Sequence, residues 1–163
     1  MAACTFFGHR DCPDTIKPHL REVLVELIVS KGVDTFYVGS QGRFDGIVRS
    51  ALRELEREYP QIHYAVVLAY MPGKKQECED FSDTILPEGM EAAHPRYAID
   101  WRNRWMLQRA DYVVTYIIHP WGGAAQYAEK AKRAGKMVIP VSSEGKRKMI
   151  STINGGDSGE SPP

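Results

Sequence analysis

Three short segments combine glycine with polar or aromatic side chains, and an apolar run precedes each of them. They are Gly8–Arg10, Gly39–Gly42 and Trp121–Gly123. Glycine lets the main chain approach a ligand closely, and free N–H groups at the start of a helix attract anions. The segments therefore predict a site for phosphate or sugar. Their candidate ligand-binding residues are Gly8, His9, Arg10, Gly39, Ser40, Gln41, Gly42, Trp121, Gly122 and Gly123.

Charged side chains extend this set. Arg10 and Arg102 are candidates for binding phosphate, because a guanidinium offers a planar fork of donors; a surface ion pair is the alternative for both. Asp45 lies in the first turn of a predicted helix, where its carboxylate can accept from a ribose hydroxyl or cap free N–H groups. Asn103, next to Arg102, joins the candidate ligand-binding residues.

Two aromatic side chains in these segments carry open alternatives. His9 can donate to a phosphate or act as an acid, and packing or exposure to solvent is the other interpretation. Trp121 can stack on a base, or it can serve as core or lid.

Metal, disulfide and cofactor chemistry is not indicated. The histidines lack the spacing of metal ligands, so no metal site and no cofactor is predicted. Cys4, Cys12 and Cys78 are odd in number and show no C-x-x-C spacing, which argues against a disulfide framework and a zinc ribbon. None of the segments matches a P-loop or a dinucleotide fingerprint.

The elements that position these residues alternate along the chain. Apolar runs predict strands at 4–8, 35–38, 63–70, 112–118 and 136–141, and helical spacing predicts helices from about Asp14, after Gly42, over 97–109 and after Gly123. This order predicts an α/β, Rossmann-like three-layer sandwich with a mainly parallel sheet of about five strands and helices on both faces. Ligands of such sheets sit beyond the carboxyl ends of the strands, where the three segments should converge.

Composition limits the remaining classes. We expect residues 1–153 to form a single domain, with a long loop at 71–96 and a disordered tail at 154–163. The formal net charge is +0, so binding of nucleic acid through bulk charge is disfavoured. We expect no membrane span and a cytoplasmic location, because no export signal or long apolar run is present.

The ordered set of motifs resembles the SLOG superfamily, and within it the YpsA-like branch most closely. The resemblance rests on Phe7–Arg10, Gly42–Asp45, Arg102-Asn103 with Met106, and Gly122-Gly123, and it spans residues 4–141. It implies a Rossmann-like fold and a small nucleotide-derived ligand, such as an ADP-ribose-type molecule. More distantly, the chain is similar to the LOG phosphoribohydrolases and to the DNA-processing DprA proteins. DprA implies single-stranded DNA binding, which the zero net charge argues against.

One departure from LOG bears on catalysis. LOG enzymes carry a catalytic glutamate in a P-G-G-x-G-T-x-x-E pattern, whereas Tyr127 stands at that position here and Glu129 should face another way. Asp45 and Asp111 are the candidates for a substitute carboxylate in an N-glycoside hydrolase or ribosyl transferase. Binding is therefore favoured over hydrolysis. Aromatic residues of the 97–109 helix make a homodimer or a higher homo-oligomer an expectation.

Overall fold

The computed structural model describes residues 2–69, 84–89 and 97–144, and it shows a single parallel sheet flanked by helices. The six strands lie in the order β4-β3-β2-β1-β5-β6, and each pairs with its neighbours in parallel. The strands are β1 (Ala2–Gly8), β2 (Val33–Val38), β3 (His63–Val67), β4 (Thr84–Ile85), β5 (Tyr112–Tyr116) and β6 (Met137–Pro140). The predicted α/β, Rossmann-like class is confirmed.

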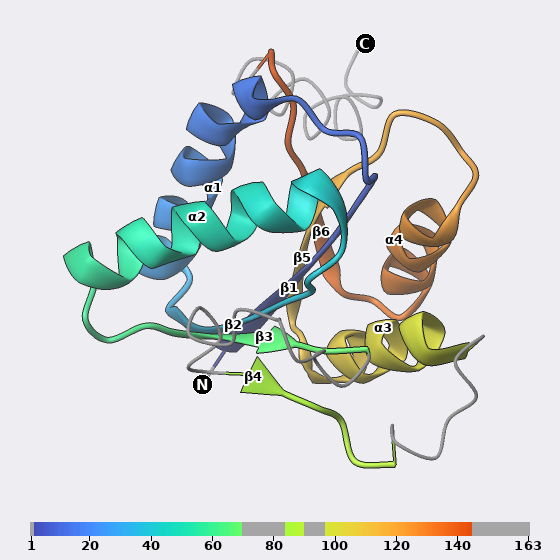
Figure 1. Cartoon of the computed structure of the whole chain (residues 1–163). Helices are drawn as coiled ribbons and strands as arrows, with labels where there is room; N and C mark the ends of the chain where they lie inside the picture. The colour runs from blue at the N-terminus through green and yellow to red at the C-terminus, as the bar shows by residue number, and fades with distance from the viewer. Residues whose placement is uncertain (1, 70–83, 90–96, 145–163) are drawn as a thin grey trace, which may run out of the picture.

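Helices cover both faces of the sheet. They are α1 (Lys17–Ser30), which a 3-10 turn at Asp14–Ile16 precedes, α2 (Gly42–Glu58), α3 (Ala98–Arg109) and α4 (Gly123–Arg133). Figure 1 shows α1 and α2 against one face, and α3 and α4 against the other. The two larger apolar clusters agree with this division, since Leu24 and Leu52 belong to one, and Met106 and Tyr127 to the other.

The apolar spacing of the sequence explains the first two helices. α1 buries Leu20, Val23, Leu24, Leu27 and Ile28. α2 buries Ile47, Val48, Ala51, Leu52 and Leu55. These side chains recur three and four residues apart in the sequence, the spacing that places apolar residues on one side of a helix.

The prediction differs from the structure at one edge of the sheet. The sheet has a sixth strand, β4, inside the segment that was expected to be a loop; its two residues are too few to give an apolar pattern. The aromatic side of α3, for which the sequence left core and subunit interface open, is partly buried, and the interface remains a prediction. Arg102, Asn103 and Met106 are buried, while Trp101 is 37% exposed. The predicted tail at 154–163 lies outside the described residues.

The order of the strands creates a switch in direction beside β1. β1 continues toward α1 on one face of the sheet, while its neighbour β5 continues toward α4 on the other face. Gly8, the last residue of β1, pairs with Tyr116, the last residue of β5. Neighbouring connections that leave for opposite faces open a crevice at the carboxyl edge, which is where α/β sheets bind ligands.

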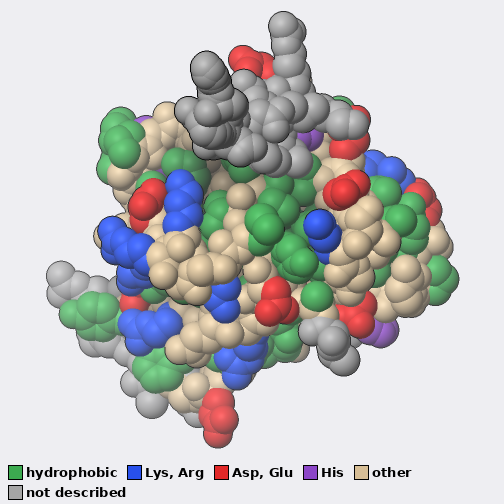
Figure 2. Space-filling view, turned by 180° about the vertical axis from the view of Figure 1, so that it is seen from behind, with side chains coloured by type: hydrophobic (Ala, Val, Ile, Leu, Met, Phe, Trp, Pro, Cys, Tyr) green, Lys and Arg blue, Asp and Glu red, His purple; other side chains and the backbone are tan. Residues whose placement is uncertain are grey.

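On the face turned away in Figure 1, several Lys and Arg side chains gather along one side, and a group of hydrophobic side chains lies near the centre with other charged side chains around it (Figure 2). Within the described ranges, no helix has both the length and the apolar character needed to cross a bilayer.

Candidate functional site

A cavity of about 180 Å³ lies at the carboxyl edge of the sheet, and residues from all three glycine segments line it. We call it the central cavity. The predicted site residues in its lining are Gly8, Arg10, Gln41, Asp45, Arg102, Asn103 and Gly123. Phe6, Phe7, Ile99 and Ala124 complete the lining. The fold thus brings together segments that are more than a hundred residues apart in the chain.

Asp45 is the buried carboxylate of the central cavity. It is 7% exposed, and the main-chain N–H of Gln41 donates to its Oδ2 at 3.0 Å. Burial raises the pKa of Asp45, whereas the positive charge of Arg102 and the bond from Gln41 act in the opposite direction. The carboxylate therefore caps the first turn of α2 and faces the cavity as well, so both predicted roles are compatible with its position.

Arg102 of α3 also lines the central cavity, and it lies next to the Asp45 carboxylate. Its Nε and Nη2 donate to Oδ1 of Asn103 at 3.2 and 2.9 Å, and the residue is 5% exposed. Asp45 Oδ2 and Arg102 Nη1 both lie against Gly39, where a Cβ would come within 2.6 and 2.7 Å of them. Gly39 thus permits the two charged groups to meet at the sheet edge.

Arg10 differs from Arg102 because it is exposed. Among the described residues, no side chain or main-chain group forms a hydrogen bond or ion pair with its guanidinium. Its main chain is held in place by Gly42, which has a φ of 82° and a position where a Cβ would lie 2.9 Å from the Arg10 Cα. The N–H of Arg43 donates to the Arg10 carbonyl at 2.9 Å. The side chain is therefore available to a ligand at the mouth of the cavity.

His9 and Trp121 lie outside the cavity lining, in a stack of rings that includes His119. The ring centroids of His9 and His119 are 3.8 Å apart, and those of His119 and Trp121 are 4.0 Å apart. The N–H of His119 also donates to Nε2 of His9 at 3.4 Å. Burial, and then the nearby His119, lower the pKa of His9. Trp121 is 66% exposed, so much of its side chain is accessible from solvent.

His119 is the member of this stack that sequence reasoning did not assign to the site. Like His9, it follows a strand, but β1 and β5 are far apart in the chain. Only the pairing of these two strands brings the rings together. The signal that could have identified His119 in the sequence is its position directly after an apolar run.

The other predicted residues occupy supporting or remote positions. Ser40 is half-buried and does not line the central cavity, and Gly122 caps the start of α4. Asp111 lies at the amino-terminal edge of the sheet, where the N–H of Ala3 donates to its Oδ2 at 3.0 Å. Because all the strands are parallel, this edge is opposite the central cavity, and Asp111 is removed from the candidate catalytic residues.

Tyr127 occupies the position where the resemblance would place a catalytic glutamate. It is 2% exposed, its ring packs against Phe7, and its hydroxyl donates to Oδ1 of Asp100 at 2.5 Å. Burial, followed by this bond, raises the pKa of Tyr127 to about 12. The residue thus joins α4 to α3. Glu129 forms an exposed ion pair with Lys132 on the outer side of α4, as the helical spacing predicts.

Among the residues that the structure describes, no group of three His, Cys, Asp or Glu side chains can hold a metal ion. The sequence matches no protein-family profile, and no curated protein matches it. The resemblance to the SLOG superfamily therefore rests on the motifs of the sequence and remains a prediction.

Proposed function

We propose that this protein binds a phosphorylated, nucleotide-derived ligand of the ADP-ribose type, with a ribose in the central cavity. The observation that carries the proposal is the convergence of Asp45, Arg102 and Arg10 on one cavity at the carboxyl edge of the sheet. A buried acceptor beside donors suits a sugar that carries hydroxyl groups and a phosphate. The resemblance to the SLOG superfamily supports the same class of ligand.

The size of the cavity limits which part of the ligand it takes. Complete sites for drug-sized ligands have volumes of roughly 300–1,000 Å³. The central cavity, at about 180 Å³, suits a ribose or a ribose phosphate, so the remainder of the ligand extends outward. Asp45 accepts from ribose hydroxyls, and Arg10 binds phosphate at the mouth.

Sensing or sequestering the ligand is favoured over hydrolysis. LOG-type chemistry requires a carboxylate at the sugar, and the corresponding residue, Tyr127, is buried between α3 and α4 with its hydroxyl on Asp100. The central cavity therefore has the groups for recognition without that glutamate.

Calorimetric titration with ADP-ribose, NAD, cyclic ADP-ribose and AMP tests the proposal. We expect binding below the millimolar range, and a loss of about tenfold or more in Asp45→Asn and Arg10→Gln, as the loss of a charged hydrogen-bond partner predicts. Asp111→Asn is the matched control, because the same substitution at the opposite edge should leave the affinity unchanged. The proposal fails if none of the four ligands binds below the millimolar range.

A second candidate function is cleavage of an N-glycosidic bond, and the buried position of Asp45 favours it. A raised pKa would let this carboxyl give a proton to the leaving base as the N-glycosidic bond breaks, while water adds to the ribose carbon and loses a proton to solvent. Chromatography of nucleoside monophosphates after incubation would separate the two functions. Free base that the wild type releases and Asp45→Asn does not release would support cleavage. Nucleotide that stays intact in the presence of the wild type would support binding alone.

A further inference from the structure

A second hollow adjoins the central cavity, and Arg10 lines both. This open groove of about 640 Å³ lies between the start of α1 and the first half of α2, and we call it the α1–α2 groove. Arg10, Lys17, Arg43 and Ser50 contribute its cationic and hydroxyl groups, and Asp14 its acid. A ligand that leaves the central cavity past Arg10 therefore enters a groove with further donors.

The cations of the groove come from separate parts of the fold. Arg10 follows β1, Lys17 begins α1, and Arg43 lies in the first turn of α2. Arg43 forms an ion pair with Asp14, and both side chains are mostly exposed, at 58% and 77%. Exposed pairs of this kind contribute little to stability, so an anion can replace Asp14 at small cost.

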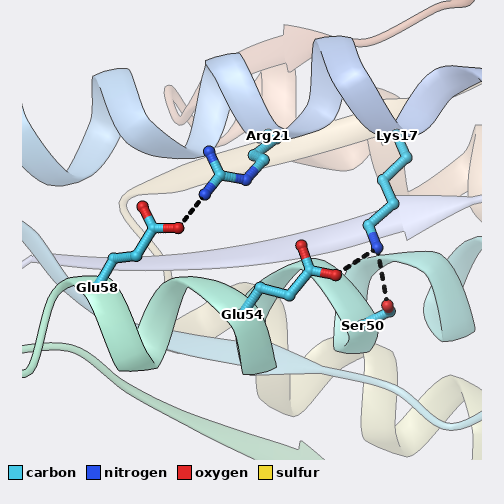
Figure 3. Close-up of polar contacts among 5 residues, drawn as sticks. All are labelled: Lys17, Arg21, Ser50, Glu54 and Glu58. Carbon is cyan, nitrogen blue, oxygen red and sulfur yellow. Dashed lines mark hydrogen bonds and ion pairs between the residues drawn. The ribbon is translucent and has the colours of Figure 1, made fainter.

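Lys17 is oriented by α2. Its Nζ lies 2.8 Å from Oε2 of Glu54 and donates to Oγ of Ser50 at 3.0 Å (Figure 3). The first turn of α1 contains no acidic residue, and Asp14 of the preceding 3-10 turn is the acidic residue next to the positive end of the helix. Three cations thus face Asp14 and Glu54 around the groove, which leaves a local excess of positive charge in a chain of formal net charge +0.

We propose that the α1–α2 groove binds the diphosphate of a ligand whose ribose occupies the central cavity, an inference that rests on the proposed function. Arg10 holds the phosphate at the junction, and Arg43 and Lys17 hold the next one. A diphosphate linked to ribose, as in ADP-ribose, uses both hollows. A ribose monophosphate uses the central cavity and Arg10 alone.

Matched charge-removing variants test the groove separately from the cavity. Arg43→Gln and Lys17→Gln each remove a cation of the groove. Arg21→Gln is the control, because Arg21 lies four residues after Lys17 on α1 and pairs with Glu58 of α2, away from the groove lining (Figure 3). All three positions are at the surface, and melting temperatures establish that the variants are folded.

Binding of ADP-ribose and ribose 5-phosphate gives the first result. We expect Arg43→Gln and Lys17→Gln to weaken ADP-ribose binding about tenfold, as for the loss of a charged contact, and ribose 5-phosphate binding less than about twofold. Arg21→Gln should change neither ligand by more than about twofold. Unchanged ADP-ribose binding in both groove variants overturns the inference, as does an equal loss for both ligands. Loss of ADP-ribose binding in Trp121→Ala, with unchanged binding in both groove variants, would indicate that the ligand leaves the central cavity toward Trp121 and would also overturn the inference.

Inorganic pyrophosphate distinguishes failure of the groove from failure of the proposed function. If no ribosyl ligand binds the wild type, the proposed function fails, and pyrophosphate then tests the groove by itself. If Arg43→Gln no longer binds pyrophosphate and Arg21→Gln still does, the result supports an anion site in the groove. Absence of pyrophosphate binding, or equal binding by both variants, overturns it.

Discussion

Replacement of Gly39 by alanine is the sharpest test of how the central cavity is built. A Cβ at this position would lie 2.6 Å from Asp45 Oδ2 and 2.7 Å from Arg102 Nη1, whereas ordinary contact begins at 3.4 Å. The carboxylate would have to retreat by about 0.8 Å, the difference between these distances. Asp45 Oδ2 accepts a hydrogen bond from the Gln41 N–H at 3.0 Å, and a shift of that size would break it.

The expected destabilisation follows from these contacts. Overpacking a buried site costs about 1–3 kcal/mol, and loss of a hydrogen bond to a charged group costs about 1.5–3 kcal/mol. Because the same shift relieves the first cost and causes the second, the two are not additive, and we expect Gly39→Ala to lower the free energy of unfolding by about 2–4 kcal/mol. Binding of ribose 5-phosphate should weaken as well, because Asp45 and Arg102 line the central cavity.

Urea denaturation at pH 7 measures the first effect, and calorimetric titration measures the second. Gly46→Ala is the matched control, since a Cβ there meets no atom within 4 Å and the position is inside α2. We expect this control to be stabilised by about 0.5–1 kcal/mol through helix propensity. If Gly39→Ala unfolds at the wild-type urea midpoint and binds ribose 5-phosphate as well as the wild type does, the close packing inferred at Gly39 is wrong.

Two further predictions concern polar groups outside the cavity. Tyr127→Phe removes the donor to Asp100 and should cost about 1–2 kcal/mol at pH 7. This hydrogen bond is the main cause of the lowered pKa of Asp100. The wild type should therefore lose its greater stability over Tyr127→Phe as the pH falls through that lowered pKa. An unchanged difference in urea midpoints between pH 7 and about pH 3 would contradict this. Burial lowers the pKa of His19, whose Nδ1 accepts from the Ser142 N–H at 3.1 Å, so wild-type stability should fall as the pH drops below 6.5. His19→Asn keeps an acceptor but cannot titrate, and equal midpoint changes between pH 7 and about pH 5 in variant and wild type would refute the role of His19.

Local patterns were sufficient for most elements of the fold. The apolar spacing of α1 and α2 identified the buried side chains of both helices, because residues three and four apart share a face in any helix. Such patterns report which side of a helix is apolar, and α3 shows their limit. Its buried face includes Arg102 and Asn103, which bond to each other and line the central cavity. A buried charge is tolerated only where partners converge on it, and one of the groups beside Arg102, the Asp45 carboxylate, comes from another segment.

The sequence by itself determined the α/β class and the glycine segments at the ends of strands, because turns and apolar periodicity depend on neighbouring residues. The tertiary structure decided which segments meet. The pairing of β1 with β5 stacks His9 on His119, and the parallel direction of the strands places Asp111 at the edge opposite the central cavity. Packing also positioned Arg10 between two hollows, a relation that no local pattern contains.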